Sequence, residues 1–231
     1  MNCKHVFTNR SMSMCLVSAL CIWLMSWICA APVSAQDVPA AAKAAAENGF
    51  RPLLKAIPPS ELAHFNFSNP AEVSQAVLGE GFRVYTIPPD LILNYDGNSS
   101  VQEMIRPTSL WFFPVVANGQ VRTTITVDMV KGEYKAVSVG GSGVATEWAL
   151  AQGKWPSSRG YKRVFVRIYQ ATADFVIVSD ATQTKMAPMP AGRALLGAGE
   201  AALLDLPEVI PALQDAVRAN IDAARLMEQA R

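Results

Sequence analysis

The sequence predicts an α+β fold, in which an antiparallel sheet of about five to six strands is flanked by N-terminal helices and a long C-terminal helix. Three observations support this class. Residues 36–80 are rich in alanine and helix-capping signals, residues 81–187 hold runs of alternating apolar and polar side chains, and residues 200–231 carry an apolar stripe at helical spacing. Helices at both ends with consecutive strands between them favour hairpins over βαβ units. We interpret residues 36–231 as a single domain.

Residues 1–35 are typical of a secretory signal peptide. Lys4 and Arg10 give a basic start, a largely apolar run follows, and residues 33–35 (Val-Ser-Ala) offer small side chains at a cleavage site. The alternative is an uncleaved membrane anchor, because the apolar run approaches the roughly 20 residues that span a bilayer. Pro32 favours cleavage, since it breaks a helix where a peptidase needs extended chain. We therefore expect an exported protein, periplasmic or secreted, that begins near Gln36.

The N-terminal part of this domain is predicted to be helical. Residues 37–57 are rich in alanine, the best helix former, and Asn48-Gly49 is expected to stop or bend that helix. A second helix over about 70–78 is predicted because Asn69 is a good N-cap and Glu72 follows it three residues later.

Alternating residues predict the strands. Residues 82–87 open the sheet, and Leu110–Val116 is expected to pair with Val121–Met129 as a hairpin about an Asn118-Gly119 turn. The odd-numbered residues 121–129 are expected on the covered face and the even-numbered ones on a polar face. Pro114 is expected at an edge or a bulge, because proline cannot donate a ladder hydrogen bond. Further strands are expected over 134–139, 161–169 and 172–178.

Glycine and proline residues mark the expected ends of the remaining helices and strands. Gly140-Gly141-Ser142-Gly143 is expected to end the third strand of the hairpin unit, with Ser142 capping a short helix over 144–152. Residues 187–199 are expected to form a loop. The C-terminal helix is predicted from apolar residues at three- and four-residue steps. These residues are Ile210, Leu213, Val217, Ile221, Ala224 and Met227.

Composition excludes several function classes once the signal is removed. All four cysteines, at positions 3, 15, 21 and 29, lie in the signal, so the exported chain holds no disulfide. Of the 20 lysines and arginines two lie in the signal, whereas all 19 aspartates and glutamates follow it, so the net charge of the exported chain falls near −1. Nucleic acid and anionic membrane surfaces, which require a clustered positive field, are therefore not expected as partners.

The sequence offers few parts for catalysis, and we expect a protein that is not an enzyme and has no cofactor. His64 is the one histidine outside the signal, and a zinc site needs several His or Cys ligands. Ser142 lies in a glycine-rich turn, but Val144 stands where a nucleophile turn needs glycine. Residues 96–100 open like a calcium loop, but its sixth and twelfth positions are a valine and a proline, where glycine and glutamate are needed.

Aromatic residues are the candidates for a binding site. Trp111, Phe112 and Phe113 are consecutive, so a strand points them to both faces of the sheet, and either a helix or a partner must cover the second face. Buried tryptophans usually supply core area, and an exposed remainder would mark a binding patch. The candidate patch comprises Trp111, Phe113, Tyr134 and Trp148.

Two segments resemble the pro-segments of known proteases. Residues 174–180 (Asp-Phe-Val-Ile-Val-Ser-Asp), followed by Met186-Ala187-Pro188, resemble a phrase in the pro-segments of streptopain-type cysteine proteases. The strand, Asn-Gly turn and following strand of residues 111–139 are similar to PepSY-like domains. The resemblance implies a free-standing inhibitor or chaperone-like domain, and it assigns no functional residue, because the phrase is structural in that family.

Two functions remain open from the sequence. One is an exported, non-catalytic binding domain with a protein partner, of the protease-inhibitor or chaperone-like kind. The alternative is a periplasmic binder of a small apolar molecule or envelope component, held in a pocket between the sheet and the helices.

Overall fold

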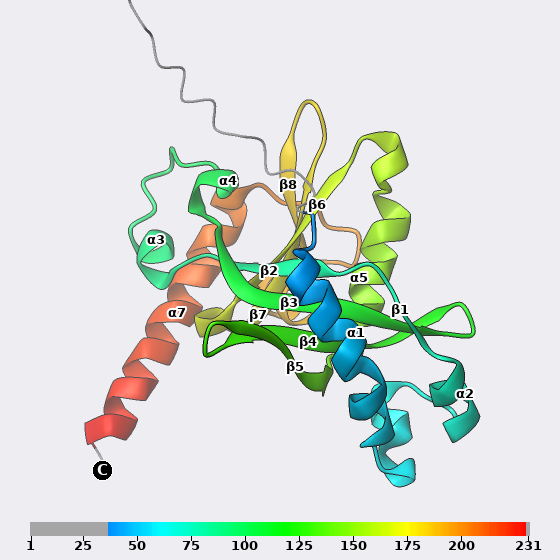
Figure 1. Ribbon diagram of the computed structural model, residues 1–231. Coiled ribbons are helices and arrows are strands. Elements are labelled where there is room, and N and C mark those ends of the chain that lie inside the picture. The colour runs from blue at the N-terminus through cyan, green and yellow to red at the C-terminus, as the bar shows by residue number, and fades with distance from the viewer. Residues whose placement is uncertain (1–36, 230–231) are drawn as a thin grey trace, which may run out of the picture. The chain divides into compact units, whose positions relative to one another are not determined.

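The computed structural model describes residues 37–229, and its elements confirm the α+β class (Figure 1). The signal peptide expected over 1–35 lies outside the described residues. The strands are β1 (Val77–Leu78), β2 (Phe82–Thr86), β3 (Arg106–Ala117), β4 (Gln120–Val130), β5 (Glu133–Gly140), β6 (Lys162–Ile168), β7 (Ala173–Ser179) and β8 (Thr184–Pro188). The α-helices are α1 (Ala40–Lys55), α2 (Pro70–Gln75), α3 (Pro89–Leu93), α4 (Val101–Met104), α5 (Ser142–Lys154), α6 (Pro190–Leu196) and α7 (Leu206–Gln229). Three short 3₁₀ segments, η1 (Pro59–Phe65), η2 (Ser157–Arg159) and η3 (Tyr169–Ala171), are the other helical elements of residues 37–229.

The strands form one mixed sheet in the order β5-β4-β3-β2-β6-β7-β8, with β1 beside β3. The sheet has eight strands where the sequence predicted about five to six, because the short strands β1 and β8 carry weak periodicity. Every pair is antiparallel except β2 and β6, which are parallel. A parallel pair needs a long crossover, and here the chain from β3 to α5 supplies it.

The β3–β4 hairpin forms as predicted. Asn118 and Gly119 have positive φ angles of 52° and 72°, as a turn that matches strand twist requires. Ile125 and Val127 are fully buried on the predicted face, whereas Met129, which was expected there too, is 42% exposed. The expectation of a solvated opposite face is wrong at Thr124, which is 1% exposed because α5 packs over β4 there. Its hydroxyl donates to the Gly140 carbonyl at 2.7 Å, so its burial leaves no polar group unpaired.

Pro114 lies in an interior strand next to a bulge. The register of β3 against β4 shifts between Val115 and Val116, in line with the expected bulge. On its other side β3 meets the irregular link between β1 and β2, where the Gly79 N–H donates to the Pro114 carbonyl at 2.7 Å. The missing N–H of the proline therefore breaks no ladder pair with β1 or β2.

Three local expectations are corrected. The first helix runs through Asn48-Gly49 without interruption, because Gly49 is the point where α1 packs closely on β5. The second helix ends at Gln75, and Val77–Leu78 becomes β1. Residues 187–199 contain α6 rather than a loop alone.

Ser142 does not cap α5 through its side chain. The N-cap is Gly141, whose φ of 71° favours glycine. The Ser142 hydroxyl instead donates to the backbone carbonyl of His64 at 3.0 Å, which links the start of α5 to η1.

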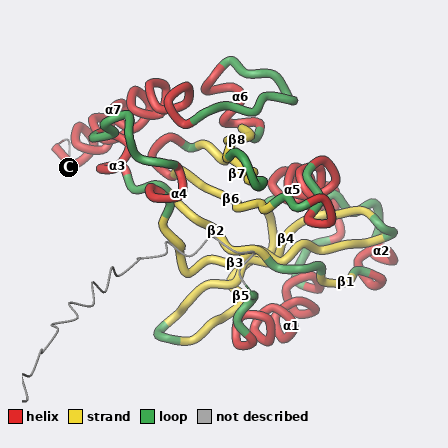
Figure 2. Tube along the Cα trace, turned by 90° about the horizontal axis from the view of Figure 1, so that it is seen from above, coloured by secondary structure: helices red, strands yellow, loops and turns green. Residues whose placement is uncertain are grey.

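Helices cover both faces of the sheet (Figure 2). Along β3, Trp111 and Phe113 belong to the cluster under α1, whereas Phe112 belongs to the cluster under α5. Along β7, Phe175 packs in the cluster of α7, whereas Val176 packs in the cluster of α5. Since neighbouring residues of a strand point to opposite faces, α1 and α7 share one face and α5 lies on the other. Within residues 37–229 no helix combines the length and the apolar character needed to cross a membrane.

Candidate binding site between β2 and β6

The two parallel strands at the centre of the sheet pair over a very short length. Only Val84 with Phe165 and Tyr85 with Val166 are partners. Ahead of these pairs, residues 81–83 and 162–164 have no partner across the gap, although each strand stays paired with its outer neighbour. We call this gap the β2–β6 fork.

Gly81 explains in part why the strands diverge. A Cβ atom at this position would lie 2.6 Å from the Phe113 ring, so only glycine lets the chain enter β2 so close to β3. The start of β2 is thereby held against β3. The start of β6 follows η2 and is held by β7, where Lys162 pairs with Ser179.

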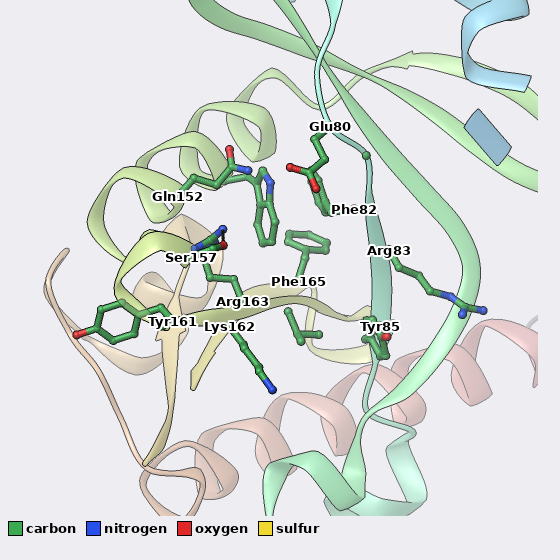
Figure 3. Close-up of a pocket in the computed structure, with 14 residues that line it drawn as sticks. Glu80, Phe82, Arg83, Tyr85, Gln152, Ser157, Tyr161, Lys162, Arg163 and Phe165 are labelled. Carbon is green, nitrogen blue, oxygen red and sulfur yellow. Dashed lines mark hydrogen bonds between the residues drawn. The ribbon is translucent and has the colours of Figure 1, made fainter. Parts of the chain in front are cut away.

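A cavity of about 350 Å³ occupies the fork (Figure 3). Its aromatic wall is Phe82, Trp148 and Phe165. The Phe82 and Trp148 rings are stacked with centroids 4.1 Å apart, and Phe165 meets Phe82 edge to face at 5.6 Å. Gln152 lies one helical turn after Trp148 on α5, so both side chains line the cavity from the same helix face.

Arg163 is the principal charged group of the fork. Its Nη2 atom donates to the Ser157 hydroxyl at 2.9 Å and its Nη1 atom to the Trp155 carbonyl. Its Nε atom is buried and has no hydrogen-bond partner. No carboxylate of the described residues forms an ion pair with Arg163. Burial lowers the pKa of its guanidinium, and the charge of Glu80 acts in the opposite direction.

Two further buried donors along the cavity have no partner. The Trp148 Nε1–H and the Tyr85 hydroxyl form no hydrogen bond, although both side chains are 5% exposed. Burial raises the pKa of the Tyr85 hydroxyl, and the charge of Arg83 opposes that shift. Tyr85 packs in the cluster of α7, whereas Trp148 and Arg163 line the cavity beside α5. Buried polar groups nearly always have partners, so the unpaired donors of Trp148 and Arg163 favour a ligand that carries an acceptor.

The charges of the fork are unbalanced. Lys162 and Arg163 line the cavity, and Glu80 is the only carboxylate among its lining residues. Figure 3 shows Glu80, Gln152 and Arg163 around the rings of the cavity, whereas Arg83 extends away from them. Low-dielectric walls concentrate the field of such groups, so the fork favours a negative ligand group.

The structure separates the aromatic residues that the sequence singled out. Trp111 and Phe113 are buried under α1, and Tyr134 is half-buried beside them. Phe113 also lines a second cavity of about 510 Å³ near the start of α1. Trp148 lies on the opposite face and lines the fork. The four residues therefore do not form one surface.

Sequence reasoning missed Arg163, Glu80 and Gln152. Each lies in a separate segment, and only the parallel pairing of β2 with β6 brings the segments together. The glycines at 79 and 81 precede β2, but they do not identify the segments that meet in the fork.

The groups considered for catalysis and metal binding have other partners. The His64 ring is exposed and bonds to the Glu61 carboxylate at 2.6 Å, and Ser142 bonds to the His64 backbone instead of its ring. Asp96 accepts from the backbone N–H groups of Asn98 and Ser99, which lower its pKa. Over the range 37–229 no three His, Cys, Asp or Glu side chains are placed to hold a metal ion.

Comparison of the chain with protein-family models, with curated proteins and with solved structures finds no match. The resemblance to protease pro-segments stays a prediction. The phrase that carries it forms β7, where Phe175 and Ile177 pack in the core.

Proposed function

We propose that this protein is an exported, non-catalytic binding domain that receives an extended segment of a partner protein in the β2–β6 fork. The observation that carries the proposal is the set of unpaired strand positions facing each other across the fork cavity. A strand without a neighbour offers its backbone N–H and C=O groups to another chain. An extended peptide can satisfy such groups by adding itself to the sheet.

The dimensions suit a short insertion. Residues 81–83 and 162–164 span three positions on each strand, of which alternate ones direct backbone N–H and C=O groups toward the fork, and an extended chain rises about 3.3 Å per residue. The cavity of about 350 Å³ falls within the usual range of ligand pockets, roughly 300–1,000 Å³. The segment therefore contributes a few residues, and the aromatic wall takes one of its side chains.

An inhibitor or chaperone-like role fits this mode of binding. Both roles require a protein to hold an extended stretch of another chain, which strand addition does largely through the backbone. The resemblance of residues 174–180 to protease pro-segments supports the same class of partner.

A small ligand with an aromatic or apolar body is the second candidate for the same cavity. The stacked rings of Phe82 and Trp148 favour it, since ligand pockets are mostly apolar with a few polar groups that fix orientation. Such a ligand would leave the unpaired backbone positions of the fork without partners, which is why the peptide is preferred.

A peptide array tests the proposal. Random heptapeptides with free termini are screened for binding to the purified protein, and the hits are measured by fluorescence polarisation. Gln152→Trp fills the cavity and is expected to abolish binding. Leu150→Trp is the matched control, because it adds the same side chain to α5 at a site that is 63% exposed and outside the fork.

Peptides that bind the wild type and Leu150→Trp but not Gln152→Trp support the proposal. Absence of any peptide hit overturns it, as does equal binding to both variants. Binding of small aromatic compounds in place of peptides would select the second candidate.

A further inference from the structure

We infer that the partner segment enters the fork with its C-terminus first and that its terminal carboxylate binds beside Arg163. The inference rests on the proposed function and names the chemical group that the fork recognises. Its basis is the closed end of the fork and the chemistry of the groups that lack partners there.

The fork accepts a chain end because it is closed at one side. At Val84 and Phe165 the two strands come together and pair, and both residues are fully buried. A segment that continued past this point would break the parallel pairs and uncover the two side chains. A chain end stops before the closed side and needs no such opening.

The unpartnered groups of the fork are donors. An indole N–H and a guanidinium can donate hydrogen bonds but cannot accept them, and the Nε1 atom of Trp148 and the Nε atom of Arg163 have no acceptor within the described residues. A terminal carboxylate is the part of a peptide with the most acceptor sites. Arginine is also the side chain whose planar guanidinium best matches a carboxylate.

Charge distinguishes the two chain ends. An N-terminal ammonium group beside Arg163 would meet a like charge, because Arg163 forms no ion pair within the described part of the chain. A carboxylate meets the Arg163 guanidinium as an opposite charge in a partly desolvated site. Glu80 is exposed, and its like charge weakens carboxylate binding without blocking the cavity.

The aromatic wall of the cavity favours particular side chains at the C-terminal residue of the partner segment. Phe82, Trp148 and Phe165 offer apolar and aromatic surface beside the carboxylate site. We expect an apolar or aromatic C-terminal residue, since ring contacts add to the burial of apolar area.

The experiment compares peptides in two forms. Pentapeptides with each of the 20 amino acids at the last position are made as free acids and as C-terminal amides, and their binding is measured by fluorescence polarisation. Free acids with apolar last residues are expected to bind about tenfold or more tightly than their amides, as a charge-assisted contact implies. A set of amides with internal Asp or Glu, and the single N-acetyl amino acids, serve as the other sources of a carboxylate.

Equal binding of acids and amides overturns the inference while leaving the proposed function intact. Tighter binding of internal Asp or Glu amides, or of the N-acetyl amino acids, also overturns it. Absence of binding by every peptide overturns the proposed function itself, so the two failures are distinguishable.

Two variants of opposite sign sharpen the test. Arg163→Gln is expected to remove the preference for the acid, with Arg159→Gln, an exposed arginine of η2 outside the cavity, as the control for the lost charge. Arg163 also donates hydrogen bonds to the Trp155 carbonyl and the Ser157 hydroxyl, so the Arg163→Gln variant can lose stability.

Glu80→Gln tests the same site without that loss of stability, because Glu80 forms no hydrogen bond or ion pair within the described residues. This variant is expected to bind the free-acid peptides about two- to fivefold more tightly than the wild type does and to bind the amides with unchanged affinity. Equal effects on acids and amides contradict the inference.

Discussion

At the scale of single residues, Glu72 stabilises the junction between α2 and the β3–β4 hairpin. It is 3% exposed, accepts the Ser68 N–H at 2.7 Å and forms an ion pair with Arg122. The Asn118 amide approaches the same carboxylate at 3.4 Å. The Ser68 hydrogen bond, more than the Arg122 charge, holds the pKa of Glu72 below its ordinary value of 4.5, against the effect of burial.

Replacing the Glu72 carboxylate is expected to change how the free energy of unfolding depends on pH. A lowered folded-state pKa stabilises the fold above the ordinary value and loses that contribution as pH falls through the folded pKa. Glu72→Gln is therefore expected to cost about 3 kcal/mol at pH 7, because the partly buried Arg122 loses its partner, and to lose less further stability on acidification than the wild type. Chemical denaturation between pH 7 and pH 3 measures both.

The matched control for this prediction is Glu133→Gln. The ion pair of Glu133 with Lys135 is solvent-exposed and is expected to contribute less than about 1 kcal/mol. If the stability of Glu72→Gln falls with pH in the same way as that of the wild type, Glu72 is not the group whose titration causes the loss.

Sequence reasoning reached Glu72 only as part of a helix cap. Asn69 accepts the Glu72 N–H at 3.0 Å, as its spacing predicted. The ion pair with Arg122 joins residues that are 50 positions apart, and no local pattern encodes such a contact. At this scale, short-range capping is predictable and long-range pairing of charges is not.

At the scale of elements, the packing of α1 on β5 depends on one glycine. A Cβ atom at Gly49 would lie 2.2 Å from the Cβ of Ala136, far inside van der Waals contact. Helix propensity alone would favour alanine there by about 1 kcal/mol. The glycine is retained in the middle of a helix because the sheet is too near for any side chain.

Two glycine-to-alanine changes should therefore have opposite signs. Gly49→Ala is expected to destabilise the protein by about 1–3 kcal/mol, because α1 must move off the sheet. Gly153→Ala, on α5 with nothing within 4 Å of the added methyl, is expected to stabilise it by about 0.5–1 kcal/mol. Thermal melting of both variants measures the difference. Stabilisation by both would mean that α1 does not contact β5 as described.

The elements differ in how far the sequence determines them. The β3–β4 hairpin was predictable, since the Asn118-Gly119 turn and the alternation on both sides are local signals. The parallel pairing of β2 with β6 was not, because it joins Val84 to Phe165 through a long crossover. The fork cavity exists only where this pairing ends, so no sequence pattern could have located it.

At the scale of the whole described unit, the sheet consists of two antiparallel parts joined by the short β2–β6 pairing. One part, β1 to β5, is covered by α1, and the other, β6 to β8, is covered by α7. On the opposite face α5 packs against both, through Phe112 of β3 and Val176 of β7. The fork therefore lies at the junction of the two parts, where an added strand would extend their contact.

Amide hydrogen exchange tests the central claim most directly. The tightest free-acid heptapeptide of the array is added to the purified protein, and the exchange rate of each backbone amide is compared with and without it. Pairing in the fork predicts slowing of about tenfold or more at amides within 81–83 and 162–164, with the edge strand β5 unchanged. Slowing on β5 with no change in the fork, or no slowing on any strand when the peptide is bound, would contradict the account.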